Sequence, residues 1–435
     1  MREGRPRWAV AGRIAEMSDG TRRSLLERTT SSDPVVRERV AGIIERVRRE
    51  GDAALRALAA ELDGVTLDAL EVPRDRWIRA LDAIDGPLRK AMERAARNIE
   101  TAHAAFRPIA QEVETERGVV IGRRPDPLGR VGVYAPGGRA LYPSSVLMGA
   151  VPARVAGVGE VILCSPPQRD GAPAAVVLAA AALAGVDRVF ALGGAGAVAA
   201  MASGTASVPR VDRIVGPGNA YVAEAKLQVS GNVAIDSPAG PSELLVICDA
   251  TADPDVVARE LVAQAEHDPD TLVLAIVIGA RATESIDAAL AAAIDAAPRR
   301  AIVSAALAAR GGVLAADDMA EAITLANEIA AEHVLVACGD SDAVLRELRG
   351  AGTVFVGATS SVAFGDYMTG ANHVLPTGGL ARCYSGLSTL DFVRWTTYQR
   401  IDRDAAARLA SDVGIFADSE GLPGHAAAAR AWSAR

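Results

Sequence analysis

The stretch GEVILCSPPQRDGAPAAVVLAAAALAGVDRVFALGG, residues 159–194, indicates the fold class. Its first part reads as a buried strand that ends in a proline turn, and DRVFALGG at 187–194 reads as a second strand that ends in glycines. Between them, residues 173–186 form an apolar run of helical length. Strand, helix and strand at this spacing are typical of parallel α/β units. We therefore predict an α/β protein built from Rossmann-like parallel sheets.

The alternation extends in both directions from this stretch. Residues 113–138 hold short β-branched runs between Gly and Pro, and residues 210–220 read as a strand and a turn. Residues 1–112 interleave charged and apolar side chains at helical spacing, and the last fifty residues combine helical patterns with a polar turn. A second set of buried strands, separated by Ala-rich helices, comprises SELLVICD (242–249), TLVLAIVIG (271–279) and EHVLVACG (332–339).

Composition excludes several classes of protein. Half of the 435 residues are hydrophobic and 23% are charged, so the chain can form the cores of two or three folded domains. The net charge of -8 argues against nucleic acid as the main partner. We expect neither secretion nor a membrane segment, because no apolar leader or run of spanning length is visible. Four widely spaced cysteines without a CxxC pair indicate a reducing, cytoplasmic location.

The rare residue types restrict the chemistry further. Lys90 and Lys226 are the only lysines, and neither stands in a Walker-type phosphate loop. The chain has no GxSxG motif, which argues against a serine hydrolase. No cysteine lies beside a histidine in the sequence, so a thiolate nucleophile has no local support.

Four of the five histidines stand in the last 170 residues, each near an amide or carboxylate side chain. The pairs are Gln264 with His267, Glu332 with His333, Asp366 with His373, and Glu420 with His425. On a helix, the spacing of the first pair puts both side chains on one face. A lone histidine is more often a surface or satisfied core residue than a metal ligand. If a metal binds here, imidazole nitrogens with Asp and Gln oxygens favour zinc.

Three glycine-rich turns are candidates for binding a cofactor. YAPGG at 134–138, LGGAGAVAA at 192–200 and GPGNA at 216–220 each follow a predicted strand and precede a helix. Backbone amides at such a helix start can hold a phosphate. A tight turn that needs glycine only for packing explains the same pattern, so both interpretations stay open.

Taken together, these motifs resemble the histidinol dehydrogenase family. The matching segments occur in the family's order over roughly residues 35–430. They are residues 130–158, 211–231, IDSPAGPSELLVI (235–247), LVAQAEHDPD (261–270), ANEIAAEHVLV (326–336), FGDYMTGANHVLPTGGLARCYSGLS (364–388) and EGLPGHAAA (420–428). Several long motifs in register are far more specific than any one of them.

The resemblance implies a zinc- and NAD-dependent four-electron oxidation of L-histidinol through histidinal to L-histidine, the last steps of histidine biosynthesis. By motif match, the zinc ligands are Gln264, His267, Asp366 and His425, and the catalytic pair is Glu332 and His333. The substrate contacts fall on Ser242, Gln264, His267, His333, Asp366, His373, Glu420 and His425, and the NAD contacts fall on Tyr134, Gly196 and Asn219.

The resemblance also implies roles and an assembly. Neutral His333 removes the alcohol proton as hydride leaves, and Glu332 then activates water for the second oxidation. The C-terminal tail of the family crosses to the partner subunit, which implies a homodimer with one zinc per subunit. The family's GGAQA turn reads GGAGA here, so Gly196 replaces a glutamine that touches NAD, and we expect NAD to bind more weakly or through backbone amides.

We expect a division of labour among the domains. Residues 1–112 and 242–385 are predicted to form the main α/β domain with the zinc and catalytic site, residues 113–241 a NAD-binding Rossmann-like domain, and residues 386–435 a helical tail. Two other functions remain open from the sequence. One is a paralogous zinc and NAD dehydrogenase of another polar amino alcohol or diol, and the other is a non-catalytic metal-binding scaffold.

Overall fold

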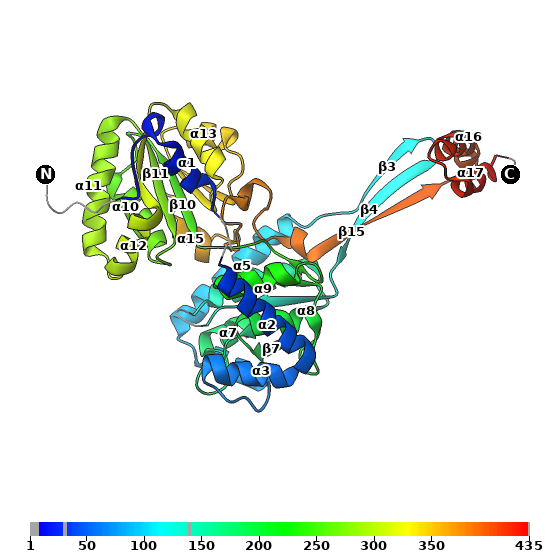
Figure 1. Cartoon of the computed structure of the whole chain (residues 1–435), viewed down its shortest axis with the longest axis horizontal. Coiled ribbons are helices and arrows are strands. Elements are labelled where there is room, and N and C mark those ends of the chain that lie inside the picture. The colour runs from blue at the N-terminus through cyan, green and yellow to red at the C-terminus, as the bar shows by residue number, and fades with distance from the viewer. Residues whose placement is uncertain (1–7, 29–32, 138–140, 434–435) are drawn as a thin grey trace.

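The computed structural model describes residues 8–28, 33–137 and 141–433, which form two α/β lobes and a projecting arm (Figure 1). The β10 lobe is built on a parallel sheet whose strand order is β1 (Val10–Arg13), β12 (Gly311–Ala316), β11 (Leu272–Ile278), β10 (Glu243–Cys248), β13 (His333–Ala337) and β14 (Thr353–Val356). Its helices are α1 (Asp19–Leu26), α10 (Pro254–Ala265), α11 (Ala280–Ala296), α12 (Arg300–Arg310), α13 (Met319–Ile329), α14 (Ser341–Glu347) and α15 (Val362–Tyr367).

The β5 lobe repeats this architecture. Its strand order is β2 (Glu71–Val72), β7 (Arg188–Ala191), β6 (Glu160–Ser165), β5 (Arg130–Tyr134), β8 (Arg213–Val215) and β9 (Ala234–Ile235), and only β2 runs antiparallel. Its helices are α2 (Pro34–Glu50), α3 (Asp52–Leu58), α4 (Arg74–Ala83), α5 (Gly86–Ala105), α6 (Pro143–Ala156), α7 (Ala175–Leu183), α8 (Gly194–Ser203) and α9 (Ala220–Val229).

Both sheets confirm the predicted Rossmann-like α/β fold. In each sheet the first strand of the chain, β1 or β2, lies at one edge. The chain then enters the middle at β10 or β5, moves outward over two strands, and returns to add two strands on the other side. All six residues of β10 are buried, as expected for a parallel strand covered by helices on both faces. The order reverses between β10 and β13 in one lobe and between β5 and β8 in the other.

The structure corrects the expected grouping of residues 1–112 with residues 242–385. The helices between residues 34 and 105 pack on the β5 lobe, because the apolar face of α2 with Val40, Ile44 and Val47 belongs to the same buried cluster as β5 and β6. Only the segment through α1 joins the β10 lobe. It includes β1, which pairs with β12 as an edge strand where the sequence predicted helix.

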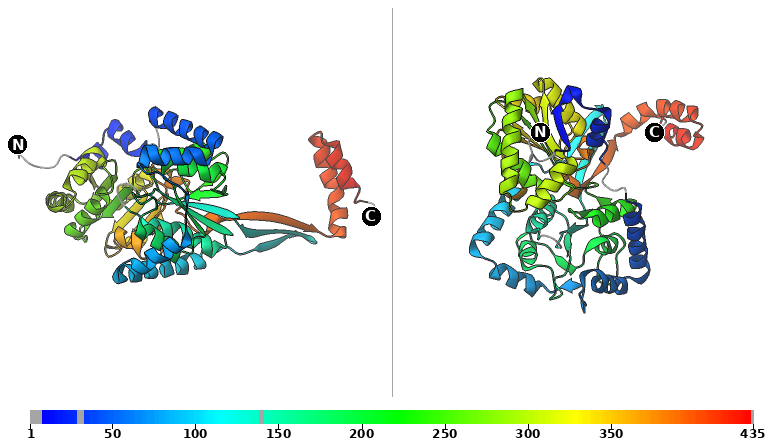
Figure 2. Two further views of the ribbon diagram at one scale, coloured as in Figure 1. Left: turned by 90° about the horizontal axis from the view of Figure 1, so that it is seen from below. Right: turned by 60° about the vertical axis from the view of Figure 1, so that its left-hand side comes forward.

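The arm corrects the boundaries of the predicted NAD domain and tail. The strands β3 (Gln111–Glu116) and β4 (Val119–Pro127) leave the β5 lobe as a pair, and β4 also pairs with β15 (Val393–Ile401). The predicted helical tail therefore contains a strand. The helices α16 (Arg403–Ser419) and α17 (Pro423–Arg430) lie at the tip, away from both lobes in each view (Figure 2). Among the described residues, no helix has both the length and the apolar character needed to cross a membrane.

Candidate functional site

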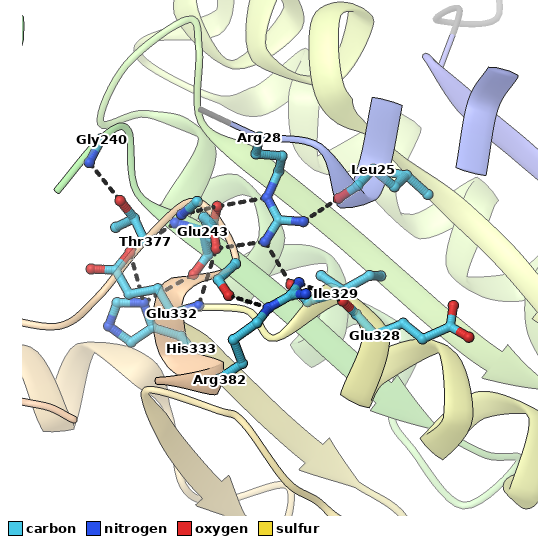
Figure 3. Close-up of polar contacts among 12 residues, drawn as sticks. Leu25, Arg28, Gly240, Glu243, Glu328, Ile329, Glu332, His333, Thr377 and Arg382 are labelled. Atoms are coloured by element: carbon cyan, nitrogen blue, oxygen red, sulfur yellow. Dashed lines mark hydrogen bonds and ion pairs between the residues drawn. The ribbon is translucent and has the colours of Figure 1, made fainter. Parts of the chain in front are cut away.

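The amino ends of β10 and β13 bring the predicted catalytic pair, Glu332 and His333, together with Glu243. The strands are adjacent and parallel, with Leu244 opposite His333. The Glu243 N–H donates to Glu332 Oε2 over 2.8 Å, and the Glu332 N–H donates back to Glu243 Oε2 over 3.2 Å. His333 Nδ1 lies 3.0 Å from the Glu243 carbonyl oxygen, as Figure 3 shows. The sheet register therefore fixes the predicted catalytic pair beside a second buried carboxylate, that of Glu243.

His333 lies between two carboxylates. Its Nδ1 is 3.4 Å from Glu332 Oε2, and its Nε2 is 3.6 Å from Asp366 Oδ1. Burial alone lowers the pKa of His333, but these carboxylates outweigh burial and raise it to about 10. Burial also raises the pKa of Glu332, and the His333 ring offsets part of that rise. Within the described part of the chain, Nε2 has no hydrogen-bond partner.

Asp366 and His373 lie on a segment that joins the lobes. His373 Nδ1 lies 2.8 Å from the Asp366 carbonyl oxygen, and its Nε2 lies 3.5 Å from Ser145 Oγ on α6. Asn372 next to it donates to the Met148 carbonyl oxygen over 2.8 Å. Burial opposes ionisation of Asp366, but contact with His333 and the charges of His373 and His267 lower its pKa. Burial lowers the pKa of His373.

Gln264 and His267 mark the end of α10. Gln264 is buried, whereas His267 stands exposed just past the helix. Glu260 on α10 accepts from the Val362 N–H at the start of α15. Gln264 lies four positions after Glu260 on α10, and Asp366 lies four positions after Val362 on α15. Each therefore lies on the helix face that carries this contact. This brings the end of α10 close to Asp366, consistent with the influence of His267 on the Asp366 pKa.

Ser242 directly precedes β10, and its carbonyl oxygen accepts from the Leu272 N–H over 3.0 Å. Glu420 caps the end of α16 and His425 lies on α17, both exposed on the arm. One chain therefore does not bring Glu420 and His425 to the other predicted ligands (Figure 1). In the described residues, no three His, Cys, Asp or Glu side chains converge as a metal site.

The three predicted NAD contacts lie at the carboxyl ends of strands of the β5 lobe. Tyr134 ends β5, and its hydroxyl oxygen accepts from the Gly194 N–H over 3.0 Å at the start of α8. Burial raises the pKa of Tyr134 to about 12. Asn219 caps α9 by accepting from the N–H groups of Tyr221 and Val222. Parallel α/β sheets bind ligands at such an edge, where the strand order reverses.

Gly196 lies buried on α8. A Cβ atom at this position would lie 3.1 Å from Leu58 Cδ1 and 3.7 Å from Leu55 Cδ2. A side chain at position 196 would therefore start towards α3 and the core. This geometry gives a packing reason for glycine at position 196.

Sequence reasoning did not single out Arg28 or Glu243. The Arg28 guanidinium and the Glu243 carboxylate form a buried ion pair next to Glu332, with an Arg28 Nε to Glu243 Oε1 distance of 2.8 Å. A charged residue at the first position of an all-apolar strand was the one signal for Glu243. No local pattern marked Arg28, because its partner is 215 positions away.

Comparison with known proteins gives a consistent result. A sequence model described as histidinol dehydrogenase matches residues 26–432. The histidinol dehydrogenase of Halobacterium salinarum is 48% identical over 415 residues, which cover 95% of this chain and 97% of that protein. The one from Pseudomonas syringae pv. tomato is 44% identical over 93% of this chain and 91% of that protein. A crystal structure of histidinol dehydrogenase from Elizabethkingia anophelis has a TM-score of 0.94 at 32% identity, covering 99% of both chains.

Proposed function

The chain belongs to the histidinol dehydrogenase family, and we propose that it oxidises L-histidinol through histidinal to L-histidine with NAD⁺ and Zn²⁺. Each of the two oxidations passes one hydride to NAD⁺, and one water adds between them, so one histidinol yields two NADH. The observation that carries the proposal is the Glu332–His333 pair, buried beside Asp366 and fixed by the register of β10 and β13.

The geometry around His333 supports a role as the base of the first oxidation. Nδ1 lies against the Glu243 carbonyl oxygen, so in the neutral ring Nδ1 carries the hydrogen and Nε2 keeps a lone pair. The flanking carboxylates favour the protonated ring, and a cation held by Asp366 would offset part of that effect. Nε2 can then take the alcohol proton as hydride leaves.

Glu332 suits the second oxidation. Burial raises the pKa of its carboxyl group, which makes the carboxylate a stronger base. It is held through Oε2 by the Glu243 N–H and lies beside the ring of His333. In this proposal Glu332 removes a proton from the water that adds to histidinal.

One chain brings together three of the four predicted zinc ligands. Gln264, His267 and Asp366 come from the adjoining ends of α10 and α15, which gives one nitrogen and two oxygen donors of the kinds that zinc accepts. When bound, Zn²⁺ supplies positive charge that orients the amino alcohol and favours loss of its hydroxyl proton. Ser242 and His373 line the same region as substrate contacts, and Tyr134, Asn219 and the amides near Gly196 would hold NAD.

The arm supports a homodimer in which the partner supplies the fourth ligand. Residues of α16 and α17 belong to none of the three buried apolar clusters of the described residues. Large apolar side chains of the arm face solvent, with Ile415 and Phe416 at 62% and 70% exposure. An apolar surface of this kind marks an interface. We propose that the arm packs on a second copy and delivers His425 and Glu420 to its site.

The deciding experiment measures NADH formed per L-histidinol consumed by purified protein with Zn²⁺, after chelation, and after Zn²⁺ is restored. We expect two NADH per substrate, loss on chelation, and recovery with Zn²⁺. If zinc binds stoichiometrically but histidinol yields no NADH, the paralogue hypothesis takes its place and other amino alcohols and diols become the candidates. Failure to oxidise any of them would favour the scaffold.

A further inference from the structure

We propose that Arg28 and Glu243 are positioning residues that hold the catalytic pair Glu332 and His333 in place. The inference rests on the proposed function and assigns that site two further residues. Neither side chain reaches the substrate in this assignment. They act through the backbone and side chain of Glu332 and through the ring of His333.

Glu243 contacts the catalytic pair through three separate groups. Its N–H donates to Glu332 Oε2, and its carboxylate Oε2 accepts from the Glu332 N–H. Its carbonyl oxygen lies 3.0 Å from His333 Nδ1. Figure 3 draws these contacts as dashed lines. A movement of Glu243 therefore shifts both catalytic side chains together.

Arg28 in turn holds the Glu243 carboxylate. Arg28 Nε donates to Oε1 over 2.8 Å and Nη2 donates to Oε2 over 3.2 Å. The guanidinium also donates to the carbonyl oxygens of Leu25 and Ile329, which ties it to α1 and the end of α13. Such a two-pronged contact constrains orientation as well as charge. The side chains of Arg28 and Glu243 are only 3% and 4% exposed.

The Glu243 carboxylate has a further partner across the site. The Gly378 N–H donates to Oε1 over 2.8 Å, and the Gly240 N–H donates to Thr377 Oγ1 over 2.5 Å. The loop after His373 is thereby fixed to the start of β10. In the described residues the Glu243 carboxylate accepts four hydrogen bonds, two from Arg28 and one each from the N–H groups of Glu332 and Gly378.

This donor set makes Glu243→Gln a specific probe. An amide has one oxygen and one NH₂ group, so the NH₂ group must face either the Glu332 N–H or the Gly378 N–H. Two donors then oppose each other, and one of the two segments has to move. A displacement of about 1 Å at a catalytic group can cost on the order of 100-fold in rate.

The burial of an ion pair is weak evidence that the pair serves only to stabilise the fold. Replacing such a pair with apolar residues of similar volume often leaves stability unchanged or raises it. The Arg28–Glu243 pair differs from an ordinary buried pair because its carboxylate bonds directly to the backbone of a catalytic residue. Orientation of Glu332 is the property that this pair supplies.

The test compares Glu243→Gln, Arg28→Lys and the double variant Arg28→Met/Glu243→Gln with the natural enzyme, loaded with Zn²⁺. Rates are expressed per zinc-loaded site, with histidinol and with histidinal as separate substrates. We expect kcat for Glu243→Gln to fall by 10- to 100-fold, KM for histidinol and NAD⁺ to change by less than threefold, and histidinal oxidation to fall more than histidinol oxidation. Arg28→Lys, which keeps one charged contact, should retain an intermediate rate.

The matched control is Arg22→Met. Arg22 lies on α1 and pairs at the surface with Glu328 of α13, so it ties the same two elements without touching Glu243. We expect its kcat per site to equal that of the natural enzyme. An unchanged kcat per site in Glu243→Gln, or equal losses in both oxidations together with a raised KM, would overturn the inference. If the natural enzyme itself yields no NADH from histidinol, the proposed function has failed instead.

Discussion

Lys226 and Asp236 form a buried ion pair that holds the backbone of one residue, Gly216, through both its N–H and its carbonyl group. Lys226 Nζ donates to the Gly216 carbonyl oxygen over 3.1 Å, and the Gly216 N–H donates to Asp236 Oδ2 over 2.8 Å. Gly216 has a φ of +117°, and a Cβ there would lie 2.1 Å from the Tyr134 carbonyl oxygen. The turn that leads to Asn219 therefore depends on two buried charges and one glycine.

The Lys226→Met variant tests this dependence. Loss of the ammonium leaves Asp236 buried without its counter-ion, and we expect the free energy of unfolding to fall by about 3 kcal/mol. With the turn loosened, KM for NAD⁺ should rise roughly tenfold, while KM for histidinol changes little. Lys226→Met/Asp236→Asn should recover stability but keep the raised KM for NAD⁺. Equal effects on both KM values would contradict the assignment of this turn to the cofactor.

Gly196→Gln tests whether glutamine at this position can serve NAD in this chain. The new side chain starts 3.1 Å from Leu58, so we expect a stability loss of about 1–3 kcal/mol from overpacking and no decrease in KM for NAD⁺. Adding Leu58→Ala makes room and should recover part of the stability. Steady-state kinetics with urea denaturation distinguishes these effects, and a lower KM in the single variant would show that the side chain reaches NAD after all.

His103 gives a pH-dependent contribution to stability. It is buried on α5, neither ring nitrogen has a hydrogen-bond partner in the described residues, and burial lowers its pKa from 6.5 to about 4. The unfolded chain therefore binds a proton at higher pH than the folded chain. The contribution is complete above about pH 6.5 and is lost as the pH falls towards 4.

The measurement is urea denaturation of the natural protein and of His103→Leu between pH 7.5 and 4.5. We expect the natural protein to lose stability more steeply below pH 6.5 than the variant, since both share the titration of the carboxylates. Parallel curves would mean that His103 stays as accessible to protons in the folded state as in the unfolded one.

Subunit mixing tests the donated arm. The His425→Ala variant keeps an intact site in its lobe but loses a ligand from its arm. The Asp366→Ala variant keeps an intact arm but loses a ligand from its lobe. If arms are exchanged, one site in each mixed dimer is intact, so two inactive proteins refolded together in equal amounts should reach about a quarter of the natural activity. Each variant refolded alone provides the control. Absence of any recovery, with mixed dimers present, would mean that the arm serves its own chain.

Strand and helix alternation predicted the fold class because buried parallel strands have a strong local signature. The misplacement of residues 34–105 has a physical origin as well. Helix α2 is amphipathic, and an apolar face such as Val40, Ile44 and Val47 shows that a helix packs but not on which sheet. The pairing of β15 with β4 was equally invisible, because register between distant strands leaves no local pattern.

The candidate site shows the same division. Glu332, His333 and Asp366 were assigned by resemblance, and the structure brings them together. The spacing of these residues in the sequence did not predict this location. The site lies at the amino ends of β10 and β13, whereas ligands of parallel sheets usually bind at the carboxyl ends. Arg28 was missed because its role appears only when α1 is packed against β10 and α13.

The strand order of the arm also bears on how the chain is made. During synthesis, the hairpin of β3 and β4 leaves the ribosome long before β15 is made. Until then, the edge of β4 that pairs with β15 has no partner strand. The strand β4 holds Arg123, Arg124, Pro125 and Pro127, and both charge and proline discourage an open edge from pairing with a foreign strand. These residues therefore disfavour aggregation of the β3–β4 hairpin of the nascent chain before β15 pairs with it.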